Sequence, residues 1–169
     1  FLPSIVYFIM INVKIIRPTV IHGLFQRYDE PRVVNELLRC IIEDKDFVMK
    51  SDGMTKKCMI YSLDAVTAIF TVLFKGTAGE AYNASNPETF ITIKELANHL
   101  FEKFNPNIKI IFDHNNVKNS DGFLPHRTLV QDCCKLRALG WEPKKGLDEI
   151  YAIDIDRFKN TKRIKKTSL

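Results

Sequence analysis

The segment from residue 92 to residue 104 has the pattern of an amphipathic helix with a defined start. It opens with Thr92-Ile-Lys-Glu95, a capping box in which the threonine and glutamate side chains can each accept a hydrogen bond from the other residue's backbone N–H. The apolar residues that follow recur at helical spacing: Ile93, Leu96, Ala97, Leu100, Phe101 and Phe104. The sequence therefore predicts a helix here that buries one face.

Other segments also have helical patterns. One begins at Pro31, and a second begins near Ser62, which can cap it. A short helix is expected to be capped by Asp132 and ended by Gly140, and a last one is expected to start near Gly146. The expected inner face of the second helix consists of Val66, Ile69, Val72 and Leu73.

Short apolar segments between the helices predict strands. They cover residues 12–17, 46–49, 57–61, 80–83 and 108–112. The resulting order is β, α, β, β, α, β, α, β, α, α, with no internal repeat and no domain linker. The expected fold class is therefore mixed α/β.

Positive charge is concentrated at the end of the chain. Residues 157–169 contain six of the 25 basic residues and no acidic one, so residues 1–156 have 19 bases against 20 acids. A nucleic-acid-binding domain usually carries its positive charge on a folded face. We therefore expect a flexible basic tail from residue 157 and no nucleic-acid partner.

Neither membrane insertion nor zinc binding is expected. Residues 1–11 are apolar apart from Ser4, but the run is shorter than the ~20 residues of a membrane span and has no signal-peptide cleavage site. The four histidines have no metal-ligand spacing, and the four cysteines contain no C-x-x-C pair. Free thiols without a secretory signal favour the cytoplasm.

A set of motifs in fixed order resembles the C-terminal part of NAD-dependent epimerases and dehydratases, the extended short-chain dehydrogenase/reductases that act on nucleotide sugars. The matching segments are Ile15–Pro18 followed by His22-Gly23, Pro31–Asn35, Ser51–Asp64, Gly79–Ala84, Thr92–Leu96 and Asp132–Pro143. They cover roughly residues 12–150. The resemblance implies a substrate-binding lobe over residues 1–156, together with the last strand or strands of a Rossmann-type fold.

The resemblance also implies a site for a UDP- or dTDP-linked sugar. Lys57 stands where the family has an arginine on the diphosphate, and Arg127 is the nearest candidate for a second such arginine. Tyr61 belongs to the same motif as Lys57, and Thr19 would touch the nicotinamide side of the cofactor. The residues expected along the base are Pro31, Arg32, Val33 and Asn35. Core packing is an alternative role for the valine and the tyrosine, and a solvated surface lysine is the alternative for Lys57.

The chemistry of this family requires two features that the sequence lacks. One is the Gly-rich turn that holds the NAD pyrophosphate, and the other is a tyrosine followed four residues later by a lysine. We expect no catalytic residue and no NAD binding in this chain alone. The partner would be a separate Rossmann half or a second copy, and the alternative function is a non-catalytic nucleotide-sugar or protein-binding module.

Overall fold

The computed structural model describes residues 12–23, 26–113, 128 and 130–167, with side chains as far as residue 160. Its helices are α1 (Val33–Glu43), α2 (Ser62–Lys75), α3 (Ile93–Phe104), α4 (Cys134–Arg137) and α5 (Leu147–Thr167). Its strands are β1 (Ile15–Pro18), β2 (Val20–His22), β3 (Phe47–Met49), β4 (Lys56–Tyr61), β5 (Ala81–Ala84), β6 (Asn86–Thr92) and β7 (Ile110–Phe112).

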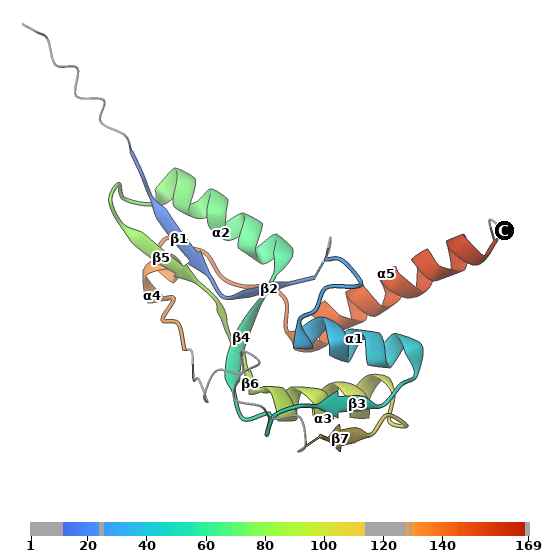
Figure 1. The fold of residues 1–169 in the computed structure, drawn as a ribbon. Coiled ribbons are helices and arrows are strands. Elements are labelled where there is room, and N and C mark those ends of the chain that lie inside the picture. The colour runs from blue at the N-terminus through green and yellow to red at the C-terminus, as the bar shows by residue number, and fades with distance from the viewer. Residues whose placement is uncertain (1–11, 24–25, 114–127, 129, 168–169) are drawn as a thin grey trace, which may run out of the picture.

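The described strands form three small sheets. β1 pairs with β5 and β3 pairs with β7, both in parallel, while β4 lies between parallel β2 and antiparallel β6. In Figure 1, β1, β5, α2 and α4 form one group, α1, α3, β3 and β7 form another, and β4 runs between them. The mixed α/β class is therefore confirmed.

Two apolar cores meet at β4. Met59 belongs to the larger core, with the inner faces of α1 and α3, Phe47 of β3, and two residues of α5. The next residue, Ile60, belongs to the second core, with α2, β5, Leu136 and Trp141. Successive side chains of a strand point to opposite faces, so one strand supplies both cores.

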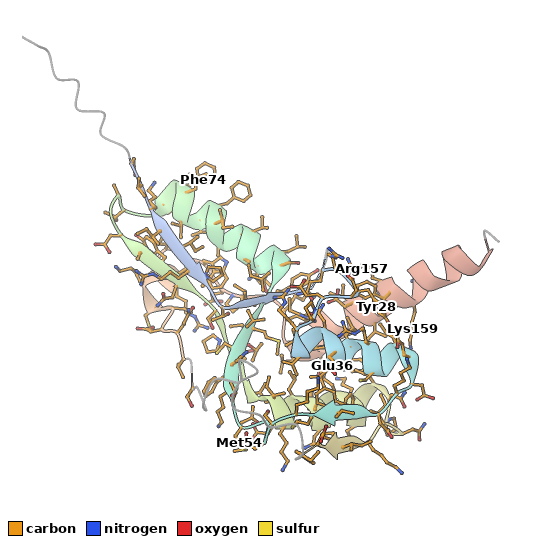
Figure 2. All side chains as sticks on the ribbon, in the orientation of Figure 1. Tyr28, Glu36, Met54, Phe74, Arg157 and Lys159 are labelled. Atoms are coloured by element: carbon orange, nitrogen blue, oxygen red, sulfur yellow. The ribbon has the colours of Figure 1, made fainter. Side chains whose placement is uncertain are left out.

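The inner face expected for α2 is wrong, apart from Val72. Val66, Ile69 and Leu73 are exposed, whereas the apolar side chains that α2 buries are mainly small: Ala65, Ala68 and Val72. Small side chains let the helix approach the strands closely, and the larger ones then point outward. Figure 2 shows Phe74 pointing away from the body of the protein at the end of this helix.

The capping box of α3 is confirmed. Thr92 Oγ1 accepts from Glu95 N at 3.0 Å, and Glu95 Oε2 accepts from Thr92 N at 2.9 Å. The caps expected for two other helices are wrong. α2 already includes Ser62 and has no side-chain cap, and the cap position of α4 is Cys133 rather than Asp132. Asp132 still contributes, because its Oδ1 accepts from Cys134 N at 2.8 Å.

Asp64 joins α2 to the segment that precedes α5. Its Oδ2 accepts from the backbone N–H groups of Lys144 and Lys145 at 2.9 and 3.1 Å, and its carbonyl accepts from Trp141 Nε1 at 3.2 Å. The carboxylate thus fixes the approach to α5, which starts at Leu147, as expected.

Some predictions differ in extent from the structure or fall outside it. The strand predictions missed β2 and β6, and the backbone of α5 continues as a helix past residue 156, where the tail was expected to begin, to Thr167. Residues 1–11 and 114–127 lie outside the described residues.

Replacing Thr92 with alanine is expected to lower the free energy of unfolding by about 1–2 kcal/mol, because the first turn of α3 loses its cap. Chemical denaturation measures the change. Glu102→Ala on the exposed face of the same helix is the control and should stay within about 0.5 kcal/mol of the parent. Equal losses in the two variants would show that the capping box is not a local anchor.

Candidate functional site

A cleft of about 400 Å³ lies where the loop between β2 and α1 meets the start of α2. Its lining comes from the end of β2, from that loop and from the first residue of α2. The lining residues are Ile21, His22, Gly23, Gln26, Arg27, Glu30, Arg32 and Ser62. The cleft therefore lies at the junction of elements from the motifs that suggested a nucleotide-sugar site.

Gly23 turns the chain at one wall of the cleft. Its φ is +121°, and a Cβ at this position would lie 2.6 Å from the ring of Tyr61. Only glycine combines that backbone conformation with so close an approach. The packing of Tyr61 thus requires Gly23, and burial raises the pKa of the phenol.

The loop is held in place by α1. Asn35 Nδ2 donates to Gln26 Oε1 at 2.9 Å and to the carbonyl of Arg27 at 3.2 Å. Arg39 Nη1 donates to the carbonyls of Tyr28 and Glu30 at 2.8 and 2.9 Å. Asn35 therefore shapes the cleft through the loop, and its amide nitrogen is already used.

Arg32 lies on the rim of the cleft, where it forms an ion pair with Glu30. It occupies the N-cap position of α1 without a side-chain hydrogen bond to the helix, so the positive end of the helix dipole lies beside it. Its Nε lies 2.9 Å from Glu30 Oε1, and both side chains are partly exposed. Pro31 precedes it on the surface, and Val33 packs against the larger core.

Behind the cleft, His22 faces Asp154 of α5. The distance from His22 Nε2 to Asp154 Oδ2 is 3.3 Å, and both side chains are fully buried. The four side-chain nitrogen and oxygen atoms of this pair have no hydrogen-bond partner among the described residues. The ring of Tyr151 lies 4.7 Å from the imidazole, and its hydroxyl donates to the carbonyl of Val34 at 3.2 Å.

Burial shifts the pKa values of the two partners in opposite directions. It lowers the pKa of His22 to about 4, with help from the positive charges of Arg32 and Arg157. It raises the pKa of Asp154 to about 6, against the effect of Arg157. His22 is therefore a neutral imidazole at pH 7.

Two further candidate residues lie outside the cleft lining. Thr19 follows β1; its N–H donates to the carbonyl of Ala84 at 3.0 Å, and its hydroxyl is buried without a partner among the described residues. Lys57 lies on β4, half-buried, with Ile91 of β6 as its ladder partner.

Arg127 lies outside the described residues, but its neighbour Thr128 is placed. Thr128 forms an isolated parallel bridge with Lys56, the residue before Lys57. Thr128 therefore lies beside β4 at Lys56.

The sequence prediction missed Asp154 and Tyr151. Both lie on the buried stripe of α5 with Ile150 and Ile155. Asp154 comes three positions after Tyr151 and directly before Ile155, so the helical pattern alone places a charge among apolar residues. Because a buried charge needs a partner, this position could have predicted one. That partner is His22, which stands where the matching motif of the resembled family has a tyrosine.

No group of three or more His, Cys, Asp or Glu side chains among the described residues could hold a metal ion. No helix within the described ranges is long and apolar enough to cross a membrane.

The fold matches solved epimerases. UDP-glucose 4-epimerase from Thermotoga maritima, solved with UDP-glucose, superposes with a TM-score of 0.72 at 21% identity, over 88% of this chain and 46% of that one. UDP-glucuronic acid 4-epimerase from Bacillus cereus, solved with UDP-glucuronic acid and NAD, gives 0.73 at 21% identity, over 89% and 46%. This chain thus has the mixed α/β fold of these epimerases, and the match covers about half of the length of each of them.

The sequence is similar to that of a dehydratase. Mouse dTDP-D-glucose 4,6-dehydratase is 27% identical over 146 residues, which are 81% of this chain and 38% of that protein. No family model matches the chain. The neighbours in sequence and structure are NAD-dependent epimerases and dehydratases, so the resemblance to their C-terminal part is confirmed.

Replacing Asp154 with asparagine should make stability fall more steeply with acid. In the unfolded chain His22 takes up a proton near pH 6.5, but in the folded protein only near pH 4, so stability is lost as pH falls through this window. In the parent protein, Asp154 takes up a proton near pH 6 in the folded state, whereas the carboxyl of the unfolded chain does so only at lower pH. This uptake stabilises the folded state and offsets most of the stability lost through His22. Without the carboxyl, the free energy of unfolding should fall by about 1–2 kcal/mol more than the parent's between pH 7 and pH 5.

Urea denaturation at a series of pH values measures this difference. The difference in free energy of unfolding between parent and variant at pH 7 is subtracted from the difference at each lower pH. This subtraction removes the direct effect of the substitution on stability. Profiles of parent and Asp154→Asn that run parallel from pH 7 to pH 5 would contradict the raised pKa of the buried Asp154 carboxyl.

Proposed function

We propose that the chain is the substrate-binding portion of an NAD-dependent nucleotide-sugar epimerase or dehydratase. The observation that carries the proposal is the agreement between motif order and geometry. The motifs that resemble this family lie far apart in sequence, yet β2, the start of α1 and the start of α2 border a single cleft. The relatives in sequence and structure act on or bind UDP- or dTDP-linked sugars.

The base of the nucleotide would lie along the start of α1. Arg32 and the N-terminus of this helix, which has no side-chain cap, would provide a guanidinium and the positive end of the helix dipole, which suit an anionic or carbonyl-rich ligand. Pro31 and Val33 would give apolar contact to the ring, and Asn35 would act through the loop that it holds.

The diphosphate would lie along β4. Lys57 would meet it as a single point charge where the family has a bidentate arginine, and Arg127 would meet it from the neighbouring segment. Tyr61 would support this wall of the site. A lysine gives less directional binding than an arginine, so the affinity should be modest and sensitive to salt.

The NAD-binding turn and the Tyr/Lys pair would have to come from residues outside this sequence. Thr19 would then border the cofactor held by that half. The four cysteines are free thiols, which suits the cytoplasm as the proposed compartment.

A non-catalytic module that binds a nucleotide sugar or a protein is the second candidate. Two departures from the family's motifs favour it. Lys57 stands where the family has an arginine, and His22, which pairs with a buried aspartate, stands where it has a tyrosine. Activity after supply of an NAD-binding half separates the two candidates, since the module would stay inactive.

Lys57→Ala should weaken binding of UDP-glucose or dTDP-glucose by about 1–3 kcal/mol, because a charge-assisted hydrogen bond to the diphosphate is lost. Lys57→Arg should preserve or strengthen binding. Isothermal titration calorimetry at low salt measures both, with Lys50→Ala, an exposed lysine on the turn after β3, as the matched control. If the alanine variants at 57 and 50 behave alike, Lys57 has no role in ligand binding.

The chain alone should not bind NAD, since it lacks the glycine-rich turn that holds the pyrophosphate. Calorimetric titration with NAD is expected to give no dissociation constant below about 100 μM, which corresponds to roughly −5.5 kcal/mol. A tighter complex would require an NAD site that the proposal does not contain.

A further inference from the structure

One side of α5 lies behind the cleft. Tyr151 reaches the start of α1, and Asp154 reaches β2. Arg157 and Phe158 follow three and four positions after Asp154, so they lie on the same side of the helix. Both contact the loop between β2 and α1, whose described residues include 26–32. This side of α5 therefore contacts α1, β2 and the loop in turn.

Gln26 holds this loop through each of its polar groups. Its N–H donates to the carbonyl of Gly23 at 3.3 Å, and its Nε2 donates to the carbonyl of Ile21 at 2.9 Å. Its Oε1 accepts from Asn35 Nδ2 at 2.9 Å, and its carbonyl accepts from Arg157 Nη2 at 2.7 Å. The other partners lie within nine positions of Gln26, whereas Arg157 lies 131 positions away. The bond from Arg157 therefore attaches Gln26 to α5.

The bond from Arg157 also restrains the residues that follow Gln26. The carbonyl of Gln26 and the N–H of Arg27 belong to one planar peptide unit, so a bond to the carbonyl sets the orientation of both. The carbonyl of Arg27 accepts in turn from Asn35 Nδ2 at 3.2 Å. Asn35 donates its backbone N–H to the carbonyl of Arg32 at 2.9 Å. A chain of hydrogen bonds thus joins Arg157 to Arg32, the residue proposed to meet the nucleotide.

Phe158 supports the loop at a second point. The centroid of its ring lies 5.0 Å from that of Tyr28, and the Arg157 guanidinium lies 4.1 Å from the same Phe158 centroid. The Tyr28 hydroxyl donates to Glu43 Oε1 at 2.7 Å, at the last residue of α1. In Figure 2 the labelled side chains of Arg157 and Tyr28 lie next to each other beside α5. The loop is thus both packed and hydrogen-bonded against α5.

Arg157 does not line the cleft itself. It is half-buried, and its guanidinium lies between the carbonyl of Gln26 and the ring of Phe158. Gln26, Arg27 and Arg32, by contrast, all line the cleft. An effect of Arg157 on a ligand in the cleft must therefore pass through the loop.

We propose that Arg157 is a positioning residue for the nucleotide-sugar cleft, where it holds the loop in the conformation that brings Arg32 to the ligand. This inference rests on the proposed function and adds a residue of the last helix to the site. Asn35 and Arg39 hold the loop from α1, and Arg157 holds it from α5. Because bonds from two helices restrain the loop, less conformational freedom is lost when the ligand binds, which favours binding.

Titration calorimetry with UDP-glucose and dTDP-glucose tests the assignment on Arg157→Met, which keeps an unbranched side chain and loses the donor. Lys159→Met is the matched control, because Lys159 is exposed on the same helix and carries the same charge. Arg157→Met should raise the dissociation constant about tenfold, as expected for the loss of a charge-assisted hydrogen bond. Lys159→Met should leave it unchanged, and Arg157→Lys, which keeps a charged donor, should recover part of the affinity.

A double-mutant cycle with Arg32 separates positioning from a general loss of structure. In the Arg32→Ala background, Arg157→Met should raise the dissociation constant by less than about threefold, because Arg157 acts through a side chain that is already removed. Equal effects of Arg157→Met in the two backgrounds would overturn the assignment.

Amide hydrogen exchange of the ligand-free protein gives a readout that needs no ligand. In Arg157→Met the amides of residues 26–30 should exchange faster, while those of α3 keep the rates of the parent and show that the fold is intact. Unchanged exchange in the loop, or an affinity of Arg157→Met equal to that of the parent, would overturn the positioning role alone. If the parent binds neither nucleotide sugar although the loop amides respond, the proposed function fails and the positioning role falls with it, so the two failures are distinguishable.

Discussion

The fold depends on the alternation of side chains along β4. Met59 and Ile60 are consecutive and fully buried, yet they belong to different cores on opposite faces of the strand. The pairing of β4 with β6 is irregular between Lys57 and Met59. Thr89 of β6 supplies hydrogen-bond partners for the backbone of Met59, because its Oγ1 accepts from Met59 N at 2.7 Å and donates to Met59 O at 2.8 Å. A one-residue shift of register would exchange the two cores, so this strand fixes how the α2 group and the α1 group are joined.

The cleft follows from this arrangement. β4 ends at Tyr61, whose ring packs against Gly23, and the next residue begins α2. Behind the cleft, α5 reaches β2 through Asp154 and the start of α1 through Tyr151. The buried pair therefore couples the last helix to β2, next to the loop that shapes the proposed ligand site.

Local signals predicted much of the fold. The capping box of α3 and its apolar stripe are contained in thirteen consecutive residues, and the structure reproduces both. β6 was missed because Asn86, Pro87 and Glu88 do not favour a strand, and its pairing with β4 is a tertiary effect. The inner face of α2 was mostly wrong because periodicity assigns the largest apolar residues to the core, whereas close packing on the strands selected Ala65 and Ala68.

The candidate site was less predictable than the fold. Motif order identified the segments around Arg32 and Tyr61, but the loop geometry set by Asn35 and Arg39 depends on side-chain bonds to carbonyls that no spacing rule reveals. The pairing of His22 with Asp154 joins residues 132 positions apart, and only the packing of α5 on β2 brings them together.

The most direct test of the central claim is a titration of the isotope-labelled chain with dTDP-glucose, followed by amide chemical shifts in NMR. The account predicts that the largest shifts fall on residues 26–35 and 56–61, while the amides of α2 beyond its first turn stay unchanged. Shifts confined to α2, or no shifts with dTDP-glucose where NAD produces them, would contradict the assignment of this chain as the nucleotide-sugar-binding portion.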